Sequence, residues 1–196
     1  MERRASMDAF WKLLRELNVE RCEKHFHTCG SWSLQEWGIA VFGELGEACN
    51  EIKKIIRGDG NKSRLAAELA DVVIYLDLLA YRAGFLIACV PDVAIDALNE
   101  RYPLPTGKTP VEVPTAKEVG SALARAARKL GDLDYEPSAY FRSVEVLFVA
   151  LPAVWQGFQL AGVLPERAIR EKFDEVSRRV GYPPSLAARG ASAAVA

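Results

Sequence analysis

The sequence predicts an all-α fold, an antiparallel bundle of helices, on three observations. Apolar residues recur with a helical period along nearly the whole chain, and no run shows the alternation of a strand. Half of the 196 residues are hydrophobic and 26% are charged, an ordinary globular balance that can bury a core. Segments rich in Gly or Pro separate the periodic stretches. One large domain or two small packed ones are therefore expected.

Local signals predict where the helices begin and end. Thr28-Cys29-Gly30 breaks the first helical pattern, and Ser33 with Glu36 three residues later forms a capping box for the second. Gly58-Asp59-Gly60 then supplies a turn. Helices are expected over about residues 6–27, 33–57, 63–84, 92–100, 115–130, 139–161 and 165–180.

The chain divides at a Pro-rich segment. Four of the ten prolines lie within 103–114, which predicts an extended linker. We expect a first module over 1–102, a second helical module over 115–187 that packs on the first, and a frayed tail over 188–196.

The two halves resemble each other weakly, as after a duplication. ELGEACNEIKKI (44–55) resembles EVGSALARAARKL (118–130), and LDLLAYRAG (76–84) resembles QGFQLAG (156–162). Only the first half retains a cluster of acidic residues. The hypothesis is a degenerate tandem duplication that folds as a single-chain pseudo-dimer.

The net charge and the cysteine content limit which cellular compartment and which partners are expected. The formal net charge of −1 argues against binding nucleic acid through a broad basic surface. No signal peptide is evident, and four cysteines are too few for a disulfide scaffold, so a cytoplasmic protein is expected. The apolar stretches 72–90 and 144–164 contain charged or polar residues, which favours buried bundle helices over membrane spans.

The chemically informative feature is a set of carboxylates on two successive helices. Glu44, Glu47 and Glu51 fall within a ~60° sector of one helix. Glu68 and Asp71, three residues apart, share a face of the next helix. The short connection makes these helices antiparallel neighbours, so the acids meet on a mostly apolar interface. Such an arrangement persists only if cations occupy the gap.

The ligand type selects the ion. Carboxylate oxygens suit Mg²⁺, with Mn²⁺ as a substitute. A di-iron centre would need Glu-x-x-His pairs, and neither helix contains a His. The alternative is a solvated acidic face that pairs with Lys53, Lys54 and Arg57.

Two other groups of residues carry chemistry that could form a site. Cys22, His25, His27 and Cys29 are zinc-type ligands, but their spacing matches no familiar zinc motif, and unliganded side chains are expected. Trp32 and Trp37 precede the acidic helix, and Tyr75 follows Asp71 by one turn. Each is a candidate either for the core or for contact with a nucleobase or sugar.

The acidic pattern resembles a known family. Glu-x-x-Glu, a spacer over 48–67 and Glu-x-x-Asp resemble the metal-binding signature of the MazG-like all-α nucleoside triphosphate pyrophosphohydrolases, a superfamily that includes the dimeric dUTPases. The blocks GELGEACNEIKKIIRG (43–58), ELADVVIYLDLLAYRAG (68–84) and KFDEVSRRVGYPPSL (172–186) also resemble phage and bacterial MazG-like proteins.

The resemblance implies a function. Glu44, Glu47, Glu68 and Asp71 would hold Mg²⁺ ions that bridge a triphosphate, and Glu47 or Glu44 would help to activate water. The products would be a nucleoside monophosphate and pyrophosphate. The expected substrate-binding residues are Lys54, Arg57, Tyr75, Trp37, Lys172 and Asp174. Neither the choice among dUTP, other nucleotides and alarmones nor the number of ions follows from the sequence.

One block departs from the family pattern. The family usually has Lys-Phe-Asn soon after the second acidic helix, whereas Lys172-Phe173-Asp174 lies far downstream. Under the duplication hypothesis, one half supplies the acids and the other supplies Lys172, giving a composite pocket. Family members form oligomers, so a homodimer is expected. The alternative function is a catalytically silent helical module that binds nucleotides or assembles with other copies.

Overall fold

The computed structural model confirms the all-α class. It describes residues 2–87, 113–131, 133, 139–183 and 185–186, and no strand occurs in these ranges. The helices are α1 (Glu2–His25), the 3₁₀ helix η1 (Cys29–Ser31), α2 (Leu34–Arg57), α3 (Lys62–Arg82), α5 (Ala116–Leu130), α6 (Ala139–Ala161) and α7 (Pro165–Arg179). The helix predicted over 92–100, most of the linker over 103–114 and the tail over 188–196 lie outside the described residues.

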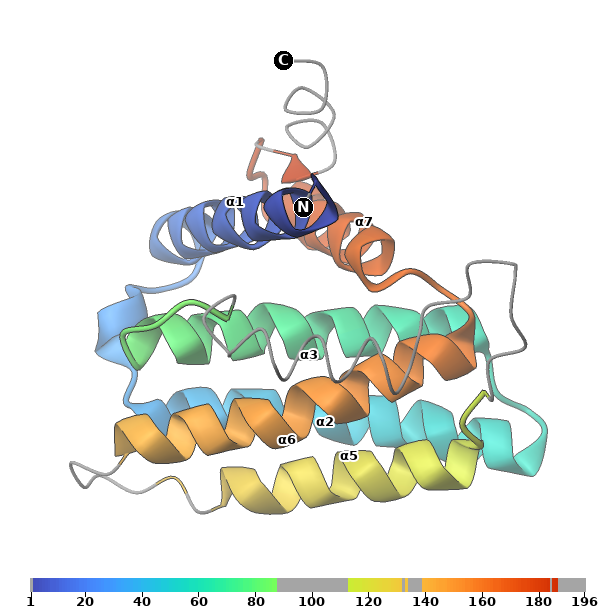
Figure 1. Ribbon diagram of the computed structural model, residues 1–196. Helices are drawn as coiled ribbons and strands as arrows, with labels where there is room; N and C mark the ends of the chain where they lie inside the picture. The colour runs from blue at the N-terminus through green and yellow to red at the C-terminus, as the bar shows by residue number, and fades with distance from the viewer. Residues whose placement is uncertain (1, 88–112, 132, 134–138, 184, 187–196) are drawn as a thin grey trace.

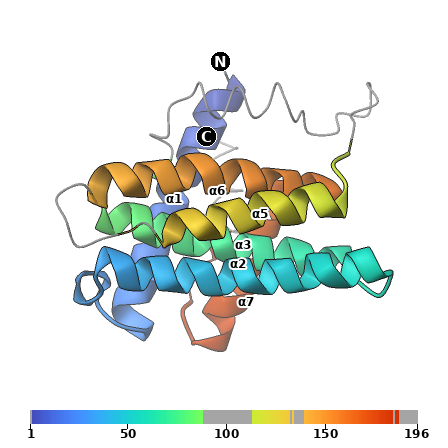
Figure 2. The same cartoon turned by 90° about the horizontal axis from the view of Figure 1, so that it is seen from below.

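Four of these helices form a bundle. α2 packs on α3 and α5, and α6 packs on the same two helices, which closes a ring of four (Figures 1 and 2). α1 and α7 cross this bundle on the outside of α3 (Figure 1). The arrangement places α3 between the acidic helix α2 on one side and α7 on the other.

Caps explain why the two acidic helices lie antiparallel. The Glu36 backbone N–H donates to Ser33 Oγ at 3.2 Å, and the Ser33 N–H donates to the Glu36 carboxylate at 2.7 Å, which confirms the capping box. Gly58 ends α2 with φ 87°, a left-handed conformation that glycine adopts without strain. Asn61 Oδ1 then accepts from the Ser63 N–H at 2.8 Å and starts α3. The chain therefore reverses within a few residues.

The two helical hairpins end alike. Gly84 after α3 and Gly162 after α6 both have positive φ, 86° and 73°. In each case the glycine N–H donates to the carbonyl three residues back, and the following N–H donates to the carbonyl five residues back. These are the glycines that the sequence comparison of the two halves pairs. The duplication and the pseudo-dimer stay a prediction.

The apolar stretches lie mainly within the bundle. α3 buries Val72, Val73 and most of the residues that follow. Its one buried charge, Asp77, accepts from Arg15 Nε at 2.9 Å, so the group that interrupts the apolar run is paired. Residues 142–161 of α6 are long and apolar enough to span a membrane by length and composition, but 61% of the most apolar window is buried, and α6 packs on α3 and α5.

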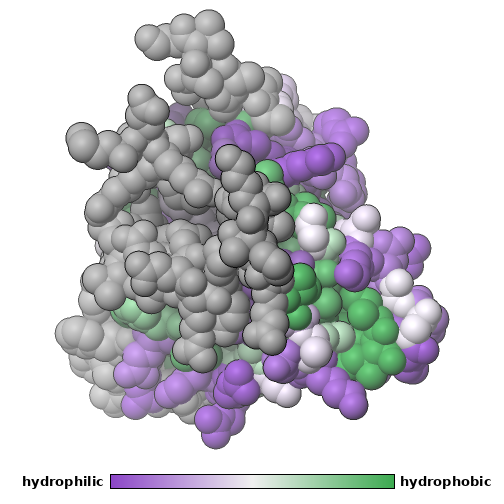
Figure 3. Space-filling view, turned by 45° about the vertical axis from the view of Figure 1, so that its right-hand side comes forward, coloured by the Kyte–Doolittle hydropathy of each residue, from purple (hydrophilic) through white to green (hydrophobic). Residues whose placement is uncertain are grey.

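The surface of α2 is not wholly polar. Large apolar side chains that are exposed include Ile39, Phe42 and Ile56, all on α2. Figure 3 shows the side of the molecule that carries the α2–α3 turn, where apolar residues (green) lie among hydrophilic ones (purple). The expected homodimer stays a prediction, since a single chain is described.

Close packing of α6 on α3 makes one glycine sensitive to substitution. A Cβ at Gly157 would lie 2.6 Å from Leu69 Cδ1, and Leu69 is fully buried. Gly157→Ala should therefore lose about 1–3 kcal/mol through overpacking against about 1 kcal/mol gained in helix propensity. The matched control is Gly46→Ala, where nothing lies within 4 Å of the new Cβ. Thermal unfolding should show lower stability for Gly157→Ala and higher stability for Gly46→Ala; the reverse order would contradict this packing.

Candidate metal centre

Three carboxylates from the two acidic helices converge. Glu44 on α2 and Glu68 and Asp71 on α3 each offer an oxygen, and these oxygens lie within 4.8 Å of one another. Ligands of one Mg²⁺ lie up to about 4.2 Å apart, because each bond is about 2.1 Å long. Small side-chain rotations therefore suffice for a shared ion, and the donor set is all oxygen, as a hard cation requires. Glu44, Glu68 and Asp71 are called the acidic triad below.

Glu47 lies at the edge of the acidic triad. It is exposed and is not one of the three converging groups. It nevertheless lies near Glu68 and contributes to raising the pKa of that carboxyl, and its charge acts on Glu44. The four acids predicted as metal ligands are thus neighbours, with three in a tight group and the fourth open to solvent.

Burial, together with the crowding of negative charge, raises the pKa of each carboxyl in the acidic triad. Burial, followed by the charges of Asp71, Glu47 and Glu68, raises the pKa of Glu44 to about 7. Burial also raises the pKa of Glu68 and of Asp71. In the absence of a cation, the group therefore holds protons at a pH where ordinary carboxyls are ionised.

A lysine from α7 completes the group. Lys172 Nζ lies 2.9 Å from Asp71 Oδ2, and both side chains are 15% exposed. Burial alone would lower the pKa of Lys172, but the hydrogen bond and charge of Asp71 raise it above its usual value. Lys172 is the only predicted substrate-binding residue outside α2 and α3 that the described structure brings to the acidic triad.

A cavity adjoins the acidic triad. It has a volume of about 210 Å³, and Glu44 and Asp71 form part of its wall. Its other lining residues are Asn18, Arg21, Cys22, Phe26, His27, Trp32, Trp37, Ile74, Tyr75, Leu78, Val176 and Arg179. The cavity wall therefore combines carboxylates of the acidic triad with aromatic and apolar side chains.

Aromatic rings on one side of the cavity pack together. The His27 and Trp32 rings stack with centroids 4.2 Å apart, and the Trp32 and Trp37 centroids lie 4.7 Å apart. Trp37 is 1% exposed and donates its Nε1–H to the Cys29 carbonyl at 3.2 Å. Tyr75 lies between this cluster and the acids, and burial raises its pKa, as do Glu44 and Asp71. Trp37 and Tyr75 therefore both line the cavity while also packing against the core.

Sequence reasoning missed the contribution of α1. Arg21 is buried, donates to the Phe173 carbonyl at 3.0 Å and to Asn18 Oδ1 at 3.2 Å, and lines the cavity. Burial lowers the pKa of Arg21 to about 10. One feature of α1 could have indicated this contribution. Its buried face changes from apolar residues such as Leu14 and Leu17 to the polar residues Asn18 and Arg21.

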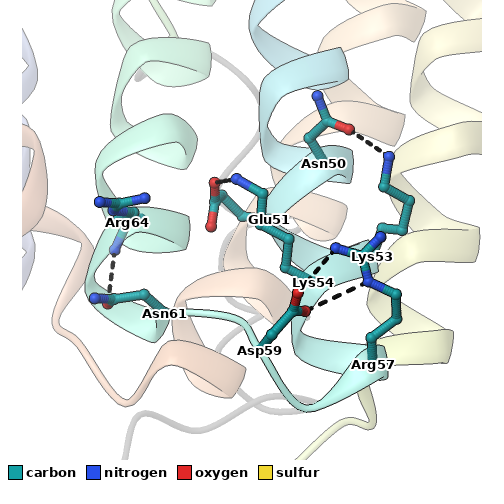
Figure 4. A network of polar contacts seen from close by, with 8 residues as sticks. All are labelled: Asn50, Glu51, Lys53, Lys54, Arg57, Asp59, Asn61 and Arg64. Atoms are coloured by element: carbon teal, nitrogen blue, oxygen red, sulfur yellow. Dashed lines mark hydrogen bonds and ion pairs between the residues drawn. The ribbon is translucent and has the colours of Figure 1, made fainter.

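Three predicted phosphate- or substrate-binding residues lie elsewhere. Lys54 forms an ion pair with Glu51, and Arg57 pairs with Asp59 at 3.0 Å near the α2–α3 turn (Figure 4). Asp174 accepts from the Ser185 hydroxyl and from the Leu186 N–H at 2.7 Å, so it anchors the segment after α7. None of the three lines the cavity.

The two histidines of the Cys-His group, which are expected to be unliganded, contact different neighbours. His25 lies against Tyr182, with centroids 5.5 Å apart, whereas His27 stacks on Trp32. Cys22 and Cys29 are buried free thiols. In the ranges that the structure describes, the acidic triad is the one group of three or more His, Cys, Asp or Glu side chains arranged to hold an ion.

Comparisons of the chain with known families, proteins and structures identify no relative. The chain matches no protein-family model, and no significant match was found among curated proteins or solved structures. The resemblance to the MazG-like superfamily therefore stays a prediction.

The raised pKa of Glu44 predicts a pH dependence of stability in EDTA. Glu44 takes up a proton at a pKa of about 7 when folded and near its ordinary value of 4.5 when unfolded. The folded state therefore binds more protons between these values, so the stability that Glu44 contributes is full below 4.5 and is lost as the pH rises through 7. Thermal unfolding from pH 4.5 to 8 should show this loss relative to Glu44→Gln. Parallel curves for the two proteins would contradict the assignment.

Proposed function

We propose that this chain is a divalent-cation-dependent hydrolase that converts a nucleoside triphosphate to the monophosphate and pyrophosphate. One observation carries the proposal: two members of the acidic triad, Glu44 and Asp71, line an aromatic cavity. Lys172 is paired with one of them, Asp71. Oxygen ligands fit Mg²⁺ or Mn²⁺, and flat rings fit a nucleobase. The proposed substrate has both parts, a polyphosphate and a base.

Glu44, Glu68 and Asp71 are the proposed ligands. A divalent ion held by these ligands would neutralise phosphate charge and lower the pKa of a water molecule that it binds. Each ligand must lose its proton before it binds, so the raised pKa of Glu44 makes ion binding favour pH values above 7. Lys172, which is held against Asp71, is the proposed cationic contact for phosphate oxygens.

Glu47 is the proposed general base, with Glu44 as the second candidate. Glu47 is exposed and adjoins the acidic triad, so it can reach a water on the open side. The oxygen of that water forms a bond to the α-phosphorus, the bond from that phosphorus to the bridging oxygen breaks, and pyrophosphate leaves. Glu47 accepts the proton that the water loses.

The cavity is the proposed site for the base. Trp37 and Tyr75 form part of its wall, and His27 and Trp32 stack beside them. Rings of this kind bind any nucleobase through its face, whereas hydrogen bonds to its edge discriminate among bases. The proposal therefore names nucleoside triphosphates as a class.

Release of pyrophosphate from a panel of NTPs and dNTPs tests the proposal. We expect release with Mg²⁺ or Mn²⁺, none in EDTA, and unchanged release by the control Glu145→Gln, an exposed acid on α6. Activity that persists in EDTA would reject the ion-dependent mechanism. Tight nucleotide binding without release would favour the silent nucleotide-binding module instead.

A further inference from the structure

Arg21 on α1 is a buried cation whose hydrogen-bond partners are all neutral. It is 4% exposed. Nη1 donates to the Phe173 carbonyl at 3.0 Å and to Ser177 Oγ at 3.2 Å, and Nη2 donates to Asn18 Oδ1 at 3.2 Å. Among the described residues no carboxylate forms an ion pair with it, and the charge of Asp71 acts on it from farther away. Buried charges in proteins are normally paired, so a ligand that supplies acceptors would stabilise this one.

Part of the Arg21 guanidinium has no partner. The group has five N–H donors, and its three hydrogen bonds use both hydrogens of Nη1 and one of Nη2. Nε makes no hydrogen bond in the described part of the chain, and it is not one of the fully enclosed atoms that lack a partner there. The unused donors are therefore Nε–H and one hydrogen of Nη2. These two nitrogens form one edge of the planar group, which fits two acceptors lying side by side.

Arg21 belongs to the wall of the aromatic cavity. It lines this cavity of about 210 Å³ together with Trp37 and Tyr75, two of the rings proposed to hold the base. Asn18 also lines it, but both hydrogens of its amide nitrogen are donated within the protein, and its oxygen accepts from Arg21. Of these two polar residues from α1, only Arg21 retains donors for a ligand.

We infer that Arg21 selects the base of the nucleotide, favouring a base with two adjacent acceptor atoms. Guanine presents such a pair at O6 and N7, which arginine contacts through two hydrogen bonds, and cytosine presents one at N3 and O2. Adenine places an amino donor beside N7, and uracil and thymine have an N–H donor between their two carbonyl oxygens. The inference rests on the proposed function, because it assigns the edge of a base whose face the rings hold.

Binding of nucleoside monophosphates tests this inference without turnover, because they carry the base and have no pyrophosphate to lose. Calorimetric titration of the full-length chain with Mn²⁺ present measures the Kd of dGMP, dCMP, dAMP, dTMP and dUMP. We expect dGMP or dCMP to bind about 10–100-fold more tightly than the other three. Arg21→Lys keeps the charge but loses the edge with two donors, so it should reduce that ratio to about 1.

A modified ligand gives a second test that leaves the protein unchanged. The deaza analogue of the tighter ligand, 7-deaza-dGMP or 3-deaza-dCMP, has carbon in place of one of the two acceptors. It should bind the natural protein about tenfold more weakly than its parent. The source of the preferred base, guanine or cytosine, follows from which parent binds more tightly.

Ser177→Ala is the matched control for Arg21→Lys. It removes one α7 partner of Arg21 Nη1 and leaves the unused edge in place. The base preference should therefore persist in Ser177→Ala, whereas a purely structural role for Arg21 would give the two variants the same preference. Circular dichroism checks the fold of both.

The outcomes separate this inference from the proposed function. Pyrophosphate release without base preference overturns the inference alone, as does a preference that survives in Arg21→Lys or a deaza analogue that binds as tightly as its parent. Selective binding without release supports the inference and contradicts the proposed hydrolysis. Failure to bind any nucleotide overturns both.

Discussion

Asp71→Asn is expected to lower kcat/KM for pyrophosphate release by at least about 100-fold, since the loss of partners that only support metal ligands typically costs 10–100-fold. Asp71 is a member of the acidic triad and the partner of Lys172. The substitution keeps the volume of the side chain but removes its negative charge. Both the divalent ion and the Lys172 ammonium group depend on that charge. Initial rates at saturating Mg²⁺, with a direct Mn²⁺ titration, measure the effect.

Asp59→Asn is the matched control for this substitution. Asp59 is exposed and pairs with Arg57 near the α2–α3 turn, outside the acidic triad. Its replacement by Asn should leave kcat/KM unchanged. If Asp71→Asn retained more than a tenth of the natural rate while Mn²⁺ still bound, Asp71 would not be a ligand in the reaction.

Lys172→Ala is expected to lower both stability in EDTA and the rate of hydrolysis, while Mn²⁺ restores only the stability. In EDTA the variant leaves the mostly buried Asp71 without its partner, so it should lose about 1.5–3 kcal/mol, the range for hydrogen bonds to charged groups. Mn²⁺ should restore that stability, because an ion replaces the missing positive charge. Hydrolysis should nevertheless fall by about 100-fold through loss of a phosphate contact.

Lys53→Ala is the control for this second prediction. Lys53 is exposed and hydrogen-bonds only to Asn50 on its own helix in the described structure, as Figure 4 shows. Chemical unfolding in EDTA and in Mn²⁺, with kinetics at saturating Mg²⁺, gives both readouts. Unchanged kinetics for Lys172→Ala would contradict a role for α7 in a composite pocket.

Local signals were sufficient to predict most of the fold. The bounds of α2 and α3 follow from a Ser33 capping box and a Gly-Asp-Gly turn, and both devices act within a few residues of the chain. The convergence of Glu44 with Glu68 and Asp71 was predictable for the same reason, because a short connection and the helical period together fix which faces meet.

Long-range packing limited the prediction of the cavity. Arg21 lies 152 residues from Phe173, whose carbonyl it contacts, and no local pattern joins α1 to α7. The position of the basic run after the acids was open for a different reason. Lys54 and Arg57 pair with Glu51 and Asp59, which lie within three residues of them in the sequence.

Anomalous diffraction from crystals grown with Mn²⁺ and a non-hydrolysable nucleoside triphosphate tests the central claim most directly. The account predicts an anomalous peak within bonding distance of Glu44, Glu68 and Asp71, with phosphate oxygens at the same ion and the base in the aromatic cavity. A nucleotide bound elsewhere, or Mn²⁺ absent from these three carboxylates at saturating concentration, would contradict it.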